Sequence, residues 1–127
     1  MLRHAELVAF IPTTNPKKAR TFYETTLGLR FVSDDQFAVV FDSNGVTIRI
    51  ANVSGVPHKP AAFTILGWTV PDIAEAIRAL GKKGVLFERY DGMKQDSLGV
   101  WTSPSGARIA WFRDPDGNVL SITELSE

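Results

Sequence analysis

The sequence contains no cysteine, and this absence excludes several kinds of chemistry at once. Disulfide bonds, thiolate nucleophiles and cysteine-bound metal centres all need a thiol, which none of the 127 residues supplies. Histidine is also scarce, since only His4, near the start of the sequence, and His58, beside a proline, are present. A structural metal site needs several converging ligands, so we expect both histidines to be solvated surface residues.

Neither sign of charge is in excess, and long apolar runs are missing too. Lysine plus arginine and aspartate plus glutamate each number 14, whereas nucleic-acid-binding domains usually carry a basic excess. No apolar stretch approaches the roughly 20 residues of a membrane-spanning helix. The first six residues include charged side chains and lack the apolar segment of a secretory signal. We therefore expect a cytoplasmic protein that binds neither nucleic acid nor membrane.

The first half of the chain shows one strand, one helix and three further strands. Asn15-Pro16 is typical of a helix start, and it predicts a helix over residues 16–26 that ends at Gly28. The adjacent pair Asn44-Gly45 is a strong hairpin signal. The strands expected in this half are Glu6–Pro12, Leu29–Ser33, Ala38–Asp42 and Val46–Ala51.

The second half repeats this order. Asp72 and Glu75 form a capping-box pattern before an apolar stripe, which predicts a helix ending near Gly81 or Gly84. The strands expected here are Thr64–Val70, Val85–Tyr90, Gly99–Thr102, Ala107–Phe112 and Val119–Glu124. We therefore predict a single α+β domain over residues 1–127. It contains two tandem βαβββ modules, at about 4–52 and 63–126, with a linker over 53–62.

Two motifs resemble the vicinal oxygen chelate superfamily, which includes glyoxalase I, extradiol dioxygenases, fosfomycin-resistance enzymes and bleomycin-resistance proteins. One is the helix at residues 15–28, which carries Phe22-Tyr23 and ends in Leu27-Gly28; the other is the turn at residues 112–118. The resemblance implies paired, curved, mixed sheets whose concave faces form a cup for a ligand. It also implies a possible homodimer. In catalytic members, four side chains on the first and last strands of each module bind a divalent metal.

In this sequence the four corresponding positions hold Val8, Arg49, Ile65 and Ser121. Aliphatic side chains and a guanidinium do not bind divalent metals, and one serine alone is a poor ligand. We therefore predict no metal and no other cofactor, although the resemblance implies a divalent metal. A shifted site that uses Glu6 or Glu124 is the alternative.

Arg49 is the most informative of these residues. Strand periodicity places it on the face opposite Ile48 and Ile50, and hence in the implied cup. Its planar guanidinium suits a carboxylate or phosphate. A buried unpaired charge costs several kcal/mol, so we expect a partner, which is either an anionic ligand or Glu6 on the neighbouring strand.

Aromatic and loop residues of the second half supply further candidates. Trp101 and Trp111 either line the cup or seal a dimer interface. Residues 87–99 form the longest polar connection, which is either a lid carrying Tyr90 and Gln95 or a solvated loop.

These observations favour a protein that binds a small anionic or aromatic molecule without a metal. Two alternatives stay open: a metalloenzyme, either a glyoxalase I-like lyase or dioxygenase-like, whose ligands lie elsewhere, and a structural or regulatory dimer with a vestigial pocket. The residues that we predict to bind the ligand are Glu6, Phe10, Arg49, Ile65, Tyr90, Gln95, Trp101, Trp111 and Ser121.

Overall fold

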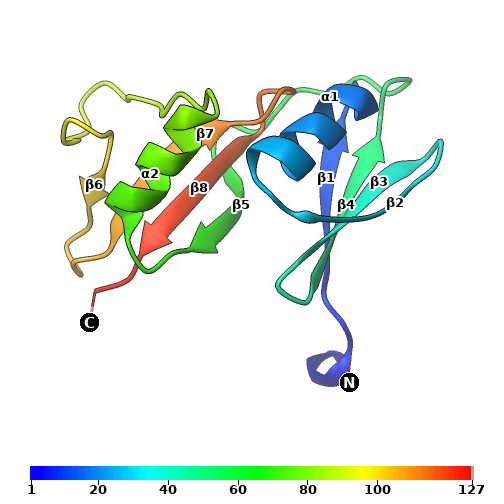
Figure 1. The fold of residues 1–127 in the computed structure, drawn as a ribbon, viewed down its shortest axis with the longest axis horizontal. Coiled ribbons are helices and arrows are strands. Elements are labelled where there is room, and N and C mark those ends of the chain that lie inside the picture. The colour runs from blue at the N-terminus through cyan, green and yellow to red at the C-terminus, as the bar shows by residue number, and fades with distance from the viewer. Residues whose placement is uncertain (127) are drawn as a thin grey trace. The chain divides into compact units, whose positions relative to one another are not determined.

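The computed structural model describes residues 1–126 and divides into two compact units, Met1–Lys59 and Pro60–Glu127. Each unit has a four-stranded mixed sheet with a helix packed on one of its faces (Figure 1). The predicted α+β class is therefore confirmed. No helix among residues 1–126 combines the length and apolar character needed to cross a membrane.

The sheet of the first unit has the strand order β1-β4-β3-β2, and β1 runs parallel to β4 while the other pairs are antiparallel. Its strands are β1 (Val8–Thr13), β2 (Arg30–Asp34), β3 (Ala38–Ser43) and β4 (Val46–Asn52), and a short 3₁₀ helix, η1 (Leu2–His4), precedes them. The turn between β3 and β4 has φ values of 48° at Asn44 and 89° at Gly45. Positive φ at both positions is what a two-residue hairpin turn requires, and this explains the Asn-Gly pair.

The helix of the first unit begins as an α-helix and ends as a π-helix. α1 (Pro16–Thr21) continues directly into η2 (Phe22–Thr26), where the N–H of Leu27 donates to the Phe22 carbonyl at 2.9 Å. At its start, the Asn15 side chain accepts a hydrogen bond from the N–H of Lys18 at 3.2 Å, as the cap prediction requires. The two segments together cover the predicted helix, but the wider π turn was not foreseen.

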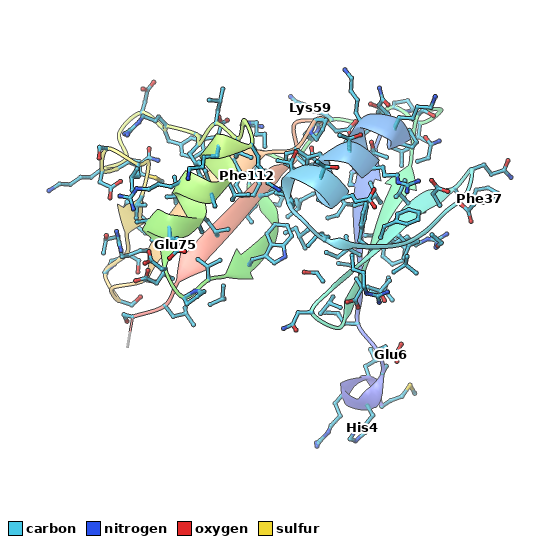
Figure 2. All side chains as sticks on the ribbon, in the orientation of Figure 1. His4, Glu6, Phe37, Lys59, Glu75 and Phe112 are labelled. Atoms are coloured by element: carbon cyan, nitrogen blue, oxygen red, sulfur yellow. The ribbon has the colours of Figure 1, made fainter. Side chains whose placement is uncertain are left out.

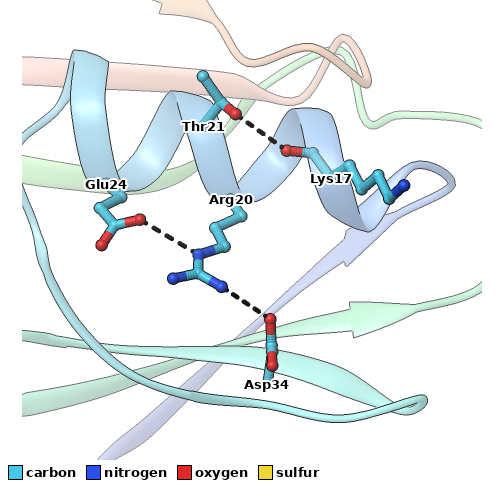
Figure 3. A network of polar contacts seen from close by, with 5 residues as sticks. All are labelled: Lys17, Arg20, Thr21, Glu24 and Asp34. Atoms are coloured by element: carbon cyan, nitrogen blue, oxygen red, sulfur yellow. Dashed lines mark hydrogen bonds and ion pairs between the residues drawn. The ribbon is translucent and has the colours of Figure 1, made fainter.

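Arg20 ties this helix to strand β2 (Figure 3). Its Nε lies 3.2 Å from Glu24 Oε1, and its Nη1 lies 3.0 Å from Asp34 Oδ2. Its guanidinium also sits 3.7 Å from the centre of the Phe31 ring. One side chain thus joins the helix to the edge strand through charge and ring contacts.

The second unit has the strand order β5-β8-β7-β6, and β5 runs parallel to β8. Its elements are β5 (Thr64–Thr69), α2 (Ile73–Lys82), β6 (Trp101–Thr102), β7 (Arg108–Arg113) and β8 (Val119–Glu124). The carboxylate of Asp72 accepts from the N–H of Glu75 at 3.1 Å, which confirms the predicted cap. The carboxylate of Glu124 accepts from the N–H of Ile73 at 2.9 Å, so β8 also anchors the start of α2.

Three predicted strands differ from the structure. β1 begins at Val8, so Glu6 lies on the exposed segment that precedes the strand (Figure 2). Residues 85–90 form no strand, and the predicted strand over 99–102 is reduced to β6. For the two segments of the second unit the reason is local competition, because the side chains of Gln95 and Asp96 bond to backbone groups that a longer strand would pair.

Each unit buries its own core between helix and sheet. In the first unit the core includes Ile11, Tyr23, Val39, Phe41, Ile48 and Ile50. In the second it includes Ile73, Ile77, Ala110, Phe112, Leu120 and Ile122. The opposite face of each sheet, here called its open face, bears the alternate residues of the same strands.

Candidate functional site

Strand register defines the open face of the second sheet, since residues paired across neighbouring strands point to the same side. One row across the sheet joins Gly67 on β5, Ser121 on β8 and Trp111 on β7. The next row consists of Thr69, Thr123, Ile109 and Trp101. Both tryptophans therefore lie on the open face, and neither belongs to the core under α2.

Three rings gather on this face, and we call Tyr90, Trp101 and Trp111 the aromatic cluster. The Tyr90 and Trp111 rings meet edge to face, with centroids 5.7 Å apart and planes at 80°. The centroids of Trp101 and Trp111 are 6.3 Å apart. All three side chains are half-buried, so each ring keeps contact area for a further partner.

The loop that carries Tyr90 is held together from within. The side-chain oxygen of Gln95 accepts from the N–H of Tyr90 at 2.8 Å. The side-chain nitrogen of Gln95 donates to the carbonyls of Glu88 at 2.9 Å and Gly99 at 2.8 Å. Both N–H donors of Gln95 are thus used inside the loop, and its predicted contact with a ligand stays a prediction. The loop has a fixed, preformed shape in this structure.

Asp96 and Arg89 reinforce the same loop. The Asp96 carboxylate accepts from the N–H groups of Leu98 and Val100, each at 2.9 Å. The Arg89 guanidinium donates to the backbone carbonyl of Asp96. Sequence patterns did not reveal this set of bonds, although residues 96–99 include the Asp, Ser and Gly that are common in turns.

The electrostatics of the loop keep the Tyr90 phenol neutral. Burial is the main cause that raises the pKa of Tyr90, and the negative charge of Glu88 acts in the same direction. Arg113 opposes this effect but is itself bound to Glu88. The phenol is therefore a stable hydrogen-bond donor at the edge of the aromatic cluster.

Ser121 lies beside the cluster as the cross-strand partner of Trp111, and Ile65 lies on β5 of the same sheet. The register of β5 against β8 shifts between Thr64 and Leu66, which leaves Ile65 as the extra, half-buried residue of a bulge. Ser121 is 8% exposed. Its hydroxyl lies next to Gly67, and a Cβ atom added to Gly67 would lie only 2.8 Å from Ser121 Oγ.

Arg49, on the open face of the first sheet, has apolar cross-strand neighbours. Arg49 on β4 pairs in register with Phe10 on β1 and with Val40 on β3. Phe10 is 65% exposed, whereas Arg49 is half-buried. Arg49 thus lies on the predicted face, between apolar neighbours on both sides.

Arg49 forms no ion pair with a carboxylate among residues 1–126, in contrast to Arg20, Arg30, Arg108 and Arg113. The expected alternative, a pair with Glu6, is wrong because Glu6 precedes β1 and does not share a row with Arg49. The charge of Arg49 does reach Asp35. The pKa of Asp35 is lowered mainly by hydrogen bonds from the N–H groups of Phe37 and Ala38, and to a smaller extent by the positive charge of Arg49.

The donor chemistry of the four positions discussed above does not fit a divalent metal. Val8 and Arg49 lie on the sheet of the first unit, and Ile65 and Ser121 on that of the second. Within residues 1–126, no three or more His, Asp or Glu side chains are grouped so as to hold a metal ion. The carboxylate of Glu124 is occupied by α2 and lies 3.7 Å from Arg108. That the protein works without a metal stays a prediction.

Comparison with known families gives one clear match. The sequence model of the Glyoxalase/Bleomycin resistance protein/Dioxygenase superfamily matches residues 2–122. Comparison with curated protein sequences finds no match.

Several solved structures share the fold. A member of the same superfamily from Sphaerobacter thermophilus is 27% identical, with a TM-score of 0.75, over 98% of this chain and 99% of that one. TnmS3, an antibiotic binding protein from a Streptomyces species, is 22% identical, with a TM-score of 0.73, over 99% of both chains. Lactoylglutathione lyase from Agrobacterium tumefaciens is 16% identical, with a TM-score of 0.72, over 95% of this chain and 93% of that one.

Proposed function

Because the chain belongs to the Glyoxalase/Bleomycin resistance protein/Dioxygenase superfamily, we propose that it binds a small aromatic molecule on the aromatic cluster, without a metal. The observation that carries this proposal is the set of three half-buried rings, Tyr90, Trp101 and Trp111, on the open face of the second sheet. Rings that serve only a core are covered by other side chains, whereas these keep exposed surface. The preformed loop limits the ordering cost that binding would otherwise incur.

The fold itself does not choose between binding and catalysis. Among the structures similar to this chain, one is an antibiotic binding protein and another is a lyase. A shared fold supports many functions, so the residues of the site must decide. The four positions that bind a metal in catalytic members hold Val8, Arg49, Ile65 and Ser121 here. Their side chains favour binding over metal-assisted catalysis.

The proposal is tested by calorimetric titration with 2-naphthoate as the probe. A well-placed aromatic pair contributes about 0.5–1.5 kcal/mol beyond its buried area, so Trp111→Leu should weaken binding by roughly tenfold. Phe37→Leu is the matched control, because Phe37 is an exposed aromatic residue of the first unit. Equal affinities of Trp111→Leu and wild type, or no binding by wild type, would refute the proposal.

Arg49 supports a second binding surface, on the first unit. Its half-buried guanidinium has no carboxylate partner among the described residues and lies between Phe10 and Val40. A small organic carboxylate would complete its hydrogen bonding. We expect the NMR signal of the Arg49 Nε–H to shift saturably when benzoate is added. Arg30, which is more exposed and lies 3.7 Å from Asp42, provides the internal control; equal shifts at both arginines would indicate only nonspecific binding.

A further inference from the structure

We infer that Gly67 and Ser121 form a notch beside the aromatic cluster that selects ring molecules carrying a hydroxyl or carbonyl substituent. The notch is the space over the Ser121 hydroxyl that the missing side chain of Gly67 leaves open. This inference rests on the proposed function, because the ring must first bind to the cluster.

The distance between the two residues shows why glycine matters at this position. Gly67 and Ser121 are direct partners on β5 and β8. A Cβ atom on Gly67 would lie 2.8 Å from Ser121 Oγ and 3.3 Å from the Ser121 carbonyl oxygen. The first distance is too short for nonbonded atoms, so any larger residue at 67 would displace the hydroxyl or the strand.

The backbone gives no other reason for glycine at this position. The glycines with positive φ are at turns and loops, and Gly67 is not among them. Gly67 therefore adopts a conformation that any residue can adopt, in the interior of a strand where glycine normally weakens the sheet. The close approach of the Ser121 hydroxyl accounts for the glycine, and the absence of a side chain at Gly67 leaves the space beside that hydroxyl open to a partner molecule.

The Ser121 hydroxyl is free to accept and donate hydrogen bonds. No hydrogen bond from its side chain is found within residues 1–126, and no polar side-chain atom described there is both sealed from solvent and without a partner. The hydroxyl therefore retains access to solvent, although Ser121 as a whole is only 8% exposed. A group in this position can donate to a carbonyl or accept from a phenol.

The position of Trp111 connects the notch to the ring site. Trp111 is the cross-strand partner of Ser121 on the side away from Gly67, and it contacts both other rings of the cluster. Directly opposed residues on one sheet face have Cβ atoms about 5 Å apart. A ring packed against Trp111 therefore brings a substituent on its edge within reach of the Ser121 hydroxyl.

The test compares 2-naphthol with naphthalene by calorimetric titration, using wild type, the Trp111→Leu variant and three further variants. One hydrogen bond of ordinary strength corresponds to about a threefold to tenfold preference for 2-naphthol in the wild type. Ser121→Ala should abolish this preference, because it should weaken the binding of 2-naphthol more than that of naphthalene. Gly67→Ala should reduce 2-naphthol binding, because the added methyl group occupies the notch. Thr123→Val is the control, since Thr123 lies in the next row of the same face and loses a hydroxyl without a change of shape.

The outcomes separate this inference from the proposed function. If Ser121→Ala keeps the wild-type preference for 2-naphthol, the notch is refuted, even when Trp111→Leu still weakens the binding of both probes. If wild type binds neither probe, the proposed function and the notch are both refuted. Should Gly67→Ala not fold, the Ser121→Ala comparison alone decides.

Discussion

The amide of Gln95 should contribute more to stability than any other polar side chain of its loop, and Gln95→Leu measures this contribution. The amide makes three hydrogen bonds, of 2.8, 2.9 and 2.8 Å, to backbone groups of Tyr90, Glu88 and Gly99. Leucine fills a similar volume but replaces none of these bonds.

The expected loss follows from these three bonds. Each is worth about 0.5–1.5 kcal/mol net, and the half-buried site places each near the lower end of that range. We therefore expect Gln95→Leu to lower the free energy of unfolding by about 2 kcal/mol. With a urea m-value of about 2 kcal/mol/M, the midpoint should fall by roughly 1 M.

Tryptophan fluorescence during urea unfolding is the appropriate assay, because Trp68, Trp101 and Trp111 all belong to the second unit. The control is Gln36→Leu, which changes an exposed glutamine of the first unit and should stay within about 0.5 kcal/mol of wild type. Equal midpoints for the two variants would show that the loop does not depend on the amide, and the argument for a preformed Tyr90 would then fail.

Three further variants test charge and titration. Hydrogen bonds from the N–H groups of Phe37 and Ala38 lower the pKa of Asp35 below 3.8, so its contribution to stability is present above that value and is lost as pH falls through the lowered pKa. Asp35→Ala should therefore destabilise the protein at about pH 7, and urea unfolding should show this difference from wild type shrinking as the pH is lowered below 3.8. Burial raises the pKa of Tyr90 above 10.0, so stability should fall as pH rises through the raised value, and Tyr90→Phe should remove this loss in urea titrations at about pH 9 and pH 11. Arg20→Gln should cost only about 1 kcal/mol in urea unfolding, because its ion pairs are partly exposed; a loss above about 3 kcal/mol would contradict this account.

Local chemistry explains which parts of the fold were predictable. The Asn44-Gly45 turn and the caps at Asn15 and Asp72 depend on residues within three positions of one another, and the structure shows all three. The segment at 85–90 has the apolar pattern of a strand, yet the Gln95 side chain takes the N–H of Tyr90 and the carbonyl of Glu88, and within the described residues only the N–H of Glu88 bonds to a strand, at the Trp111 carbonyl. Whether a backbone pairs with a strand or with a side chain is decided by tertiary contacts that a pattern does not contain.

The candidate site likewise has features that local sequence predicts and features that only tertiary contacts determine. The alternation of side chains along β4 was enough to place Arg49 on the face of the sheet opposite that of Ile48 and Ile50. The register of the sheet and the burial of both isoleucines agree. The close approach of Gly67 to Ser121 could not be predicted in this way, because it depends on the pairing of two strands distant in sequence. An isolated glycine inside a strand was the only available signal for that approach.

The most direct test of metal-free ring binding is calorimetric titration of 2-naphthoate into protein dialysed against EDTA. The titration is then repeated with one equivalent of Zn²⁺, Ni²⁺, Mn²⁺ or Fe²⁺. We predict the same affinity in every case, because Val8, Arg49, Ile65 and Ser121 offer no set of metal ligands. Binding that disappears after dialysis and returns with one metal ion per chain would contradict the account.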